Sequence, residues 1–188
     1  MIRPWHFYGR TQESQDLACH PEILPDLRGR RGIGTYTIRG RRGVGKTRLL
    51  HEVRAARDPA IPFLHAELSA GDASACLEML RDTVTEAGLS SLLADMPVCP
   101  ALYSDRSCFK DIVRALLLKG VIVALDEFHH ATAAGLALSI KKMIDDLART
   151  SDSIPPGKLV LMGSHEQQMQ RMFRADHRFT GEATPTLR

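Results

Sequence analysis

The segment GRRGVGKT, Gly40 to Thr47, constrains the fold of this chain more than any other part of its sequence. It has the spacing G-x-x-x-x-G-K-[ST], which works as a phosphate-binding loop only between a strand and a helix. The β-branched stretch TYTIR precedes the segment, and TRLLHEVRAA, with apolar residues at helical spacing, follows it. The sequence therefore predicts a strand, a loop and a helix whose N-terminus faces the phosphates.

Each residue type in this loop has a physical reason. The glycines let backbone N–H groups approach the phosphates closely, Lys46 reaches the β- and γ-phosphates, and the Thr47 hydroxyl binds Mg²⁺. The alternative is a Gly-rich turn with solvated arginines, and the correct flanking elements favour the nucleotide site. The residues expected to bind the nucleotide here are Gly40, Arg41, Arg42, Gly43, Val44, Gly45, Lys46, Thr47 and Arg48.

A nearly identical segment, RGRRGIG, lies directly upstream, from Arg28 to Gly34. Gly29 and Gly34 have the same spacing, but Thr35 and Tyr36 stand where Lys and Ser or Thr are needed. A strand is predicted to follow this copy, and a strand offers no helix N-terminus for an anion. We therefore expect one phosphate-binding loop, with the first copy acting as a turn into the first strand.

Two acidic residues follow the apolar run VIVAL, Val121 to Leu125, which is typical of a strand covered on both faces of a parallel sheet. Asp126 is suited to hold Mg²⁺ through its water shell, and Glu127 to polarise a water that attacks the γ-phosphate. The alternative is a solvated Asp-Glu turn. Kinases of small molecules share the loop but must position an acceptor hydroxyl, so the acidic pair favours hydrolysis.

Ser164 follows another apolar run, KLVLMG, from Lys158 to Gly163. A polar side chain at that strand end can form a hydrogen bond with the γ-phosphate or the attacking water. Ser164 is therefore a candidate catalytic residue, with Lys46 and Glu127. Capping of a helix predicted over Glu166–Phe173 explains Ser164 nearly as well.

The rest of the chain alternates strands and helices, which predicts an α/β fold with a mostly parallel sheet. We divide it into an N-terminal segment, residues 1–33, and a core, residues 34–188. The other predicted elements are a strand over Phe63–Leu68 and helices over Gln12–Cys19, from Asp72 or Ser74 to about Ala87, over Phe109–Leu118 and over Ala133–Arg149.

Composition excludes several classes of protein. The chain has 188 residues, enough for one domain, and its 44% hydrophobic and 25% charged residues are typical of a soluble protein. No apolar run reaches the roughly 18 residues of a membrane span, and MIRPWHFYGR lacks the apolar segment of a secretory signal. We expect a cytoplasmic protein without a membrane partner. A net charge of +3 is too small to indicate nucleic acid by itself.

Metal binding by cysteine or histidine is not favoured. His129 and His130 are adjacent, and neighbouring side chains point in different directions on most backbones. The four cysteines have neither CxxC spacing nor paired histidines, and we expect them to be reduced thiols: Cys19, Cys76, Cys99 and Cys108.

Together these motifs resemble the archaeal-type ATPases, in the signal-transduction branch of the AAA-like P-loop NTPases. The resemblance implies a three-layer P-loop NTPase sandwich, with the strand of the phosphate loop near the centre of the sheet, and ATP as the nucleotide. It also implies that Phe7, Gly9 and Arg10 lie near the adenine, although packing of the N-terminal segment on the core is an equal alternative. The matching features are FYGR followed by Glu13, GRRGVGKTRLL, VIVALDEF, and LVLMGS followed by Met169, Met172 and Phe173.

The chain departs from this family in two ways. Its relatives usually continue through a fifth strand into a C-terminal domain, whereas this sequence stops at Arg188, so we expect the fifth strand and that domain to be missing. Relatives often carry an arginine where this sequence has Glu182. The candidates left for an arginine that acts on a neighbouring subunit are Arg171, Arg174 and Arg178.

The sequence thus predicts a cytoplasmic, Mg²⁺-dependent domain that binds ATP, hydrolyses it slowly and serves as a nucleotide switch. One alternative is a nucleotide-binding module with little turnover, belonging to a larger protein. Another is a helper ATPase for DNA transposition or repair, for which a basic DNA-binding domain would be needed. The expected partners are ATP and either a second copy of the chain or another protein, and DNA binding stays open.

Overall fold

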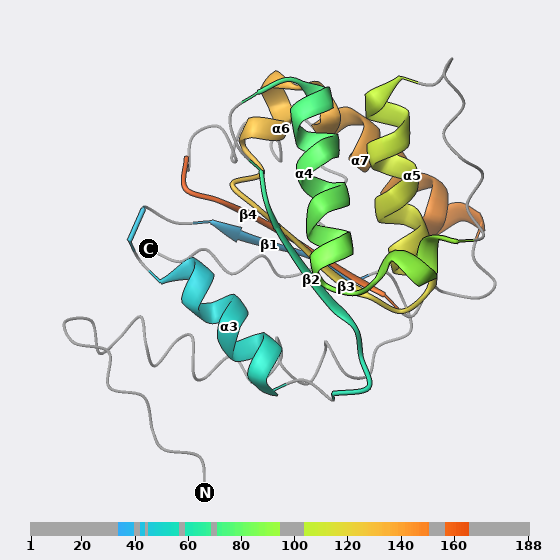
Figure 1. Cartoon of the computed structure of the whole chain (residues 1–188). Coiled ribbons are helices and arrows are strands. Elements are labelled where there is room, and N and C mark those ends of the chain that lie inside the picture. The colour runs from blue at the N-terminus through green and yellow to red at the C-terminus, as the bar shows by residue number, and fades with distance from the viewer. Residues whose placement is uncertain are drawn as a thin grey trace, which may run out of the picture.

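The computed structural model describes residues 34–39, 42–43, 45–56, 59–68, 71–94, 104–150 and 157–165. Strands and helices alternate through these residues, as the sequence predicts (Figure 1). Their order is β1 (Gly34–Arg39), α3 (Lys46–Ala56), β2 (Phe63–Glu67), α4 (Ala73–Glu86), the 3₁₀ turn η1 (Ser90–Leu93), α5 (Asp105–Leu118), β3 (Ile122–Asp126), α6 (His130–Ala133), α7 (Leu136–Thr150) and β4 (Lys158–Gly163).

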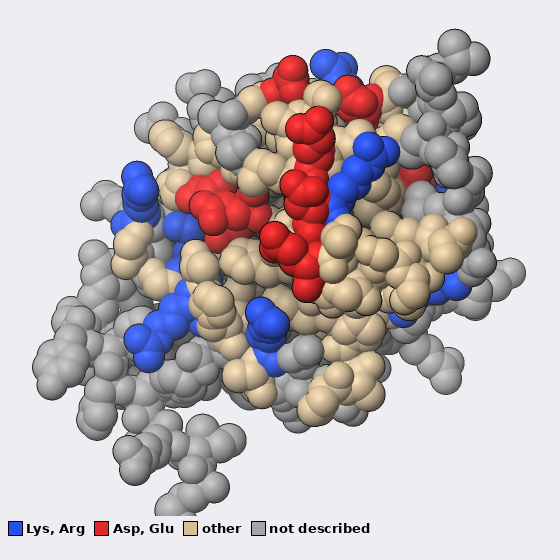
Figure 2. All heavy atoms as spheres, viewed as in Figure 1, with Lys and Arg blue, Asp and Glu red and all other residues tan. Residues whose placement is uncertain are grey.

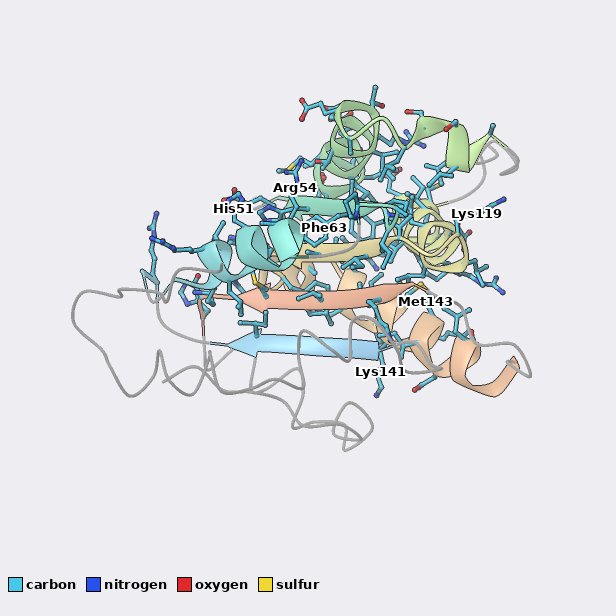
Figure 3. The ribbon with its side chains drawn as sticks, turned by 90° about the horizontal axis from the view of Figure 1, so that it is seen from below. His51, Arg54, Phe63, Lys119, Lys141 and Met143 are labelled. Carbon is cyan, nitrogen blue, oxygen red and sulfur yellow. The ribbon has the colours of Figure 1, made fainter. Side chains whose placement is uncertain are left out.

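The four described strands form one parallel sheet in the order β1-β4-β3-β2 (Figure 3). This confirms the predicted α/β fold with a parallel sheet. The resemblance implies that the strand before the phosphate loop, β1, lies near the centre of the sheet. In the described sheet β1 instead lies at an edge. The stretch Phe179–Arg188, which the resemblance indicates as the lead-in to a fifth strand, lies outside the described residues.

The sheet is covered on both faces, which makes the three layers. Helix α3 packs on one face, and α4, α5 and α7 pack on the other (Figure 1). Successive side chains of a strand point to opposite faces. In β3, Ile122 and Ala124 accordingly pack toward α3, whereas Val123 and Leu125 join the larger cluster beneath α4, α5 and α7. Burial on both faces explains why this strand reads as an unbroken apolar run.

The larger cluster is built from helices whose apolar residues recur at helical spacing. Helix α5 contributes Phe109, Val113 and Leu116, each fully buried, and α7 contributes Met143, which is labelled in Figure 3. On the opposite face the cluster is small, and Leu50 of α3 packs there with Phe63 of β2. None of the described helices is long and apolar enough to cross a membrane.

Two helix boundaries differ from the prediction. Helix α5 begins at Asp105, four residues before the predicted Phe109, because Ser104 caps it by accepting a hydrogen bond from the Ser107 N–H. The helix predicted from Ala133 begins at Leu136, because Gly135, at φ 69°, turns the chain out of the preceding short helix. Asp72 caps α4, one of the two predicted starts. The helices predicted over Gln12–Cys19 and Glu166–Phe173 lie outside the described residues.

Candidate functional site

The carboxyl ends of β1 and β3 and the first turn of α3 meet at one end of the sheet. In a parallel sheet all strands end at the same edge, and the helix that follows β1 starts there. Thr47, on the first turn of α3, donates a hydrogen bond from its hydroxyl to Oδ2 of Asp126, at 3.1 Å. The two motifs, 79 residues apart in the sequence, are therefore in direct contact.

Lys46, the residue before Thr47, has 6% of its surface exposed. A lysine is rarely buried without a charged partner. Burial lowers the pKa of Lys46, while the nearby carboxylates of Glu127 and Asp126 raise it and offset part of that effect. The ammonium group therefore has anionic neighbours in the folded chain, and a bound phosphate would add another.

Asp126 is 4% exposed and is surrounded by hydrogen-bond donors. Its Oδ1 accepts a bond of 2.7 Å from the N–H of Glu127, and Nε2 of His65 lies 3.6 Å from Oδ2. Burial by itself would raise the pKa of Asp126, but His65, the Glu127 N–H and Thr47 outweigh it, so the pKa is lower than the ordinary value. Asp126 is ionised at neutral pH.

Glu127 turns away from the strand with a left-handed backbone, at φ 51°, the one positive φ of a non-glycine among the described residues. Its Oε2 accepts hydrogen bonds from the hydroxyl and the N–H of Ser164, at 2.6 Å and 3.2 Å. Nδ1 of His129 lies 3.1 Å from the same oxygen. The structure thus brings the two predicted residues Glu127 and Ser164 together, and it adds His129, which no sequence motif assigns to the site.

The described part of the phosphate loop has the backbone that its glycines predict. Gly43 and Gly45 have φ values of 83° and 92°, in the region that favours glycine. Arg42 and Arg48 are exposed. Gly40, Arg41 and Val44 lie outside the described residues, as do Phe7, Gly9 and Arg10. Thr35 and Tyr36, after the first copy, lie in β1, so a strand does follow that copy as predicted.

The proximity of His65 to Asp126 follows from strand parity together with the pairing of β2 with β3. In β2, Leu64 and Ala66 pack into the larger cluster, so His65 points to the face that α3 covers. Its register partner is Ala124, and Asp126 is two residues further along β3 on the same face. Parity gives only the face on which His65 lies, because the pairing of β2 with β3 is decided by the tertiary structure.

His129 and His130 do not point apart, contrary to the expectation for neighbouring side chains. Their ring centroids are 4.1 Å apart, and the ring of His165 lies 4.5 Å from that of His129. Even so, the described residues contain no group of three or more His, Cys, Asp or Glu side chains that could hold a metal ion. Burial and the neighbouring His130 lower the pKa of His129, against the opposing effect of Glu127. Its imidazole is neutral at pH 7.

The residues present fit a magnesium ion held together with a nucleotide. Mg²⁺ prefers oxygen ligands, keeps several waters and takes only one or two carboxylates, so it does not need a cluster of protein ligands. The hydroxyl of Thr47 and the ionised carboxylate of Asp126 supply such oxygens, side by side. When bound, the ion would neutralise charge on the phosphates.

Charge is distributed unevenly over the described surface. Figure 2 shows Lys and Arg side chains gathered over α3 and the loop before it, and a line of acidic side chains over α4. Arg42, Arg48 and Arg54 are exposed on the basic side. The exposed acidic residues of α4 are Glu78, Asp82 and Glu86. A positive neighbourhood around the loop would attract an anionic ligand.

Comparison with solved structures supports the fold. The ORC2 protein of Aeropyrum pernix, in a structure described as its ADPNP-ADP complexes, matches with a TM-score of 0.58 at 19% identity, over 98% of this chain and 48% of that one. A Walker-type ATPase of Pyrococcus abyssi matches with a TM-score of 0.54 at 19% identity, over 96% and 53%. Cdc6p of Pyrobaculum aerophilum matches with a TM-score of 0.57 at 16% identity, over 98% and 48%.

These matches define the class of the fold: the chain has the α/β fold of P-loop ATPases. It spans about half the length of the proteins it matches. No protein-family model matches the sequence, and neither does any curated protein. The similarity therefore lies in the arrangement of strands and helices.

Proposed function

We propose that this chain is a cytoplasmic ATP-binding domain that hydrolyses ATP slowly, with Mg²⁺, and acts as a nucleotide switch. The observation that carries the proposal is the contact of Thr47 with Asp126 beside the buried Lys46. A hydroxyl, a carboxylate and an ammonium group converge where a helix begins, which is the arrangement that phosphate binding with Mg²⁺ requires. The ADPNP-ADP complexes of the similar ORC2 protein support an adenine nucleotide.

In this proposal each residue has a separate task. Backbone N–H groups of the phosphate loop and Lys46 hold the β- and γ-phosphates, while Thr47 and Asp126 hold the magnesium ion. Glu127 accepts a proton from the attacking water, and Ser164 holds Glu127 at the end of β4. Phe7, Gly9 and Arg10 are proposed to contact the adenine.

Slow turnover is expected because a glutamate stands where such sites often carry the arginine that accelerates hydrolysis. An arginine that stabilises the charge developing on the γ-phosphate typically raises the rate of hydrolysis by a factor of about 10³–10⁵. Glu182 stands where the ATPases that the sequence resembles often carry that arginine. A long-lived ATP state suits a switch that acts on a second copy of the chain or on a protein partner.

The test is to measure nucleotide binding and phosphate release by the purified 188-residue chain, with and without Mg²⁺, across a dilution series. We expect Mg²⁺-dependent ATP binding and turnover below the roughly 1 s⁻¹ of typical enzymes. Turnover per chain should rise with protein concentration if a second copy completes the site. Fast hydrolysis that is independent of concentration would contradict the switch, and no ATP binding would contradict the whole proposal.

A further inference from the structure

The residues that follow two neighbouring strands contact one another at the end of the sheet. They are Glu127, His129, Ser164 and His165. Ser164 and His165 follow β4, and Glu127 and His129 follow β3, its neighbour in the sheet. The hydroxyl of Ser164 donates a hydrogen bond to Glu127, and the ring centroid of His165 lies 4.5 Å from that of His129. The backbone N–H of Phe128, between the two β3 residues, donates to the Met162 carbonyl of β4. The pairing of the two strand ends therefore holds the side chains of Ser164 and His129 next to Glu127.

All recorded contacts of the Glu127 carboxylate fall on one oxygen. Oε2 accepts both bonds from Ser164 and lies 3.1 Å from Nδ1 of His129. Among the described residues no contact is recorded for Oε1, and the side chain is 26% exposed. A carboxylate held through one oxygen leaves the other oxygen available to a water, which a base for water attack requires.

His129 is suited to hold that oxygen. Its side chain is 5% exposed, and Nδ1 is buried without a hydrogen bond of good geometry to any described residue. The nearby carboxylate oxygen is an acceptor that a small rotation would bring into line. A neutral imidazole has one N–H, and an N–H on Nδ1 would meet Oε2 without placing a positive charge beside Lys46. Burial of an unpaired polar atom costs free energy, which favours this bond.

We infer that His129 is a positioning residue for Glu127: with Ser164 it holds Oε2, so that Oε1 faces the attacking water. The inference rests on the proposed function, because it assigns His129 a role in ATP hydrolysis through Glu127. The left-handed backbone of Glu127 is part of the same arrangement, since a strained residue persists only where its surroundings determine it. His129 acts on turnover and has no part in holding the phosphates.

The test compares two variants of nearly the same shape, His129→Asn and His129→Leu. An asparagine amide can donate from a position close to that of Nδ1, whereas leucine has no donor. We expect His129→Leu to lower kcat by about tenfold, as loss of a positioning contact often does, with KM for ATP unchanged. His129→Asn should recover most of the loss. His130→Leu, at the adjacent histidine, is the matched control and should stay close to wild type.

A second arm shows whether His129 works through Glu127. In a chain that already carries Glu127→Gln, His129→Leu should cause no further loss of kcat, because the base that it positions is gone. Thermal melting of each variant separates folding from turnover, and His129→Phe keeps the ring volume if the leucine variant fails to fold. Equal kcat losses in the asparagine and leucine variants, an unchanged or raised kcat in the leucine variant, or additive losses with Glu127→Gln would overturn the inference.

Failure of the inference is distinguishable from failure of the proposed function. If wild type binds and hydrolyses ATP, loses turnover with Glu127→Gln and is indifferent to His129→Leu, only the role of His129 is wrong. If wild type shows no hydrolysis, or if Glu127→Gln matches wild type, the proposed chemistry is wrong and the inference fails with it.

Discussion

The candidate site has two halves that are built differently. The phosphate half consists of Lys46, Thr47 and the loop before them, on a helix that packs through the smaller apolar cluster. The strand-end half consists of Asp126, Glu127, His129 and Ser164, next to strands buried on both faces. The first half offers backbone N–H groups and one ammonium, whereas the second contains a network of carboxylates, a hydroxyl and an imidazole.

This difference separates binding from chemistry. A loop and a helix N-terminus bind a ligand mainly through backbone N–H groups, so the main-chain conformation determines how well the ligand fits. Side chains at the ends of buried strands have little freedom, and hydrogen bonds between them fix their orientation. Substitutions in the phosphate half should therefore affect affinity, and substitutions in the strand-end half should affect turnover. Substitution of Asp126, which accepts a hydrogen bond from Thr47, should affect both affinity and turnover.

The largest expected effect is on binding, from Lys46→Ala. It removes a buried positive charge from a place where Glu127 and Asp126 already lie close, so a phosphate would meet uncompensated negative charge. We expect Mg-ATP binding to be abolished in a titration with a fluorescent nucleotide. The control is the first copy, where Arg30→Ala with Arg31→Ala should leave affinity within a few-fold. Equal losses from the two would contradict a single phosphate-binding loop.

Glu127→Gln should have the next largest effect, and only on turnover. The amide keeps the side-chain shape but cannot accept the proton, so turnover should fall by about 10²-fold or more. ATP should still bind, as a titration will show. Glu67→Gln is a matched control, because Glu67 is exposed at the end of β2, beside Asp126 in register. Steady-state hydrolysis equal to wild type would show that Glu127 is not the base.

Asp126→Asn tests the connection between the halves. The change removes the charge that Mg²⁺ would meet, and it weakens the acceptor of the Thr47 hydroxyl. We expect Mg²⁺-dependent ATP affinity to fall by about tenfold or more. Binding measured in the presence of a chelator should change little. Asp82→Asn, on the exposed face of α4, should leave both values unchanged. An equal loss with and without Mg²⁺ would contradict the assignment.

The smallest expected effect is on stability and comes from the titration of His129. Because its pKa is below the ordinary 6.5 in the folded chain, the unfolded chain binds more protons as pH falls through about 6.5. The free energy of unfolding should therefore decrease from that pH down to the folded-state pKa. The groups involved are His130, Glu127, His165 and Lys46. Urea unfolding at pH 7.5 and 5.5 should show a smaller decrease in His129→Asn than in wild type.

Much of the fold was predictable, because its elements carry local patterns. The unbroken apolar runs before Asp126 and Ser164 are buried parallel strands, as predicted, and Asp72 begins a helix. Boundaries were less predictable where one cap or one glycine decided them. Ser104 starts α5 earlier than its apolar spacing indicated, and Gly135 separates α7 from the turn before it. Such devices depend on the φ and ψ of single residues, which periodicity does not reveal.

The sequence by itself determined which residue types could bind phosphate, and it distinguished the two copies, since Lys46 and Thr47 follow only the second. A motif is a local pattern, and local patterns specify local backbone and chemistry. Only the tertiary structure decided which side chains meet. The pairing of β3 with β4 brings Ser164 to Glu127, and the turn after β3 brings His129 to the same oxygen. Contact across strands depends on the packing of distant segments, so no single segment could show that Ser164 meets Glu127. The contact of His129 is local, but it depends on the left-handed backbone of Glu127, which the residue pattern does not reveal.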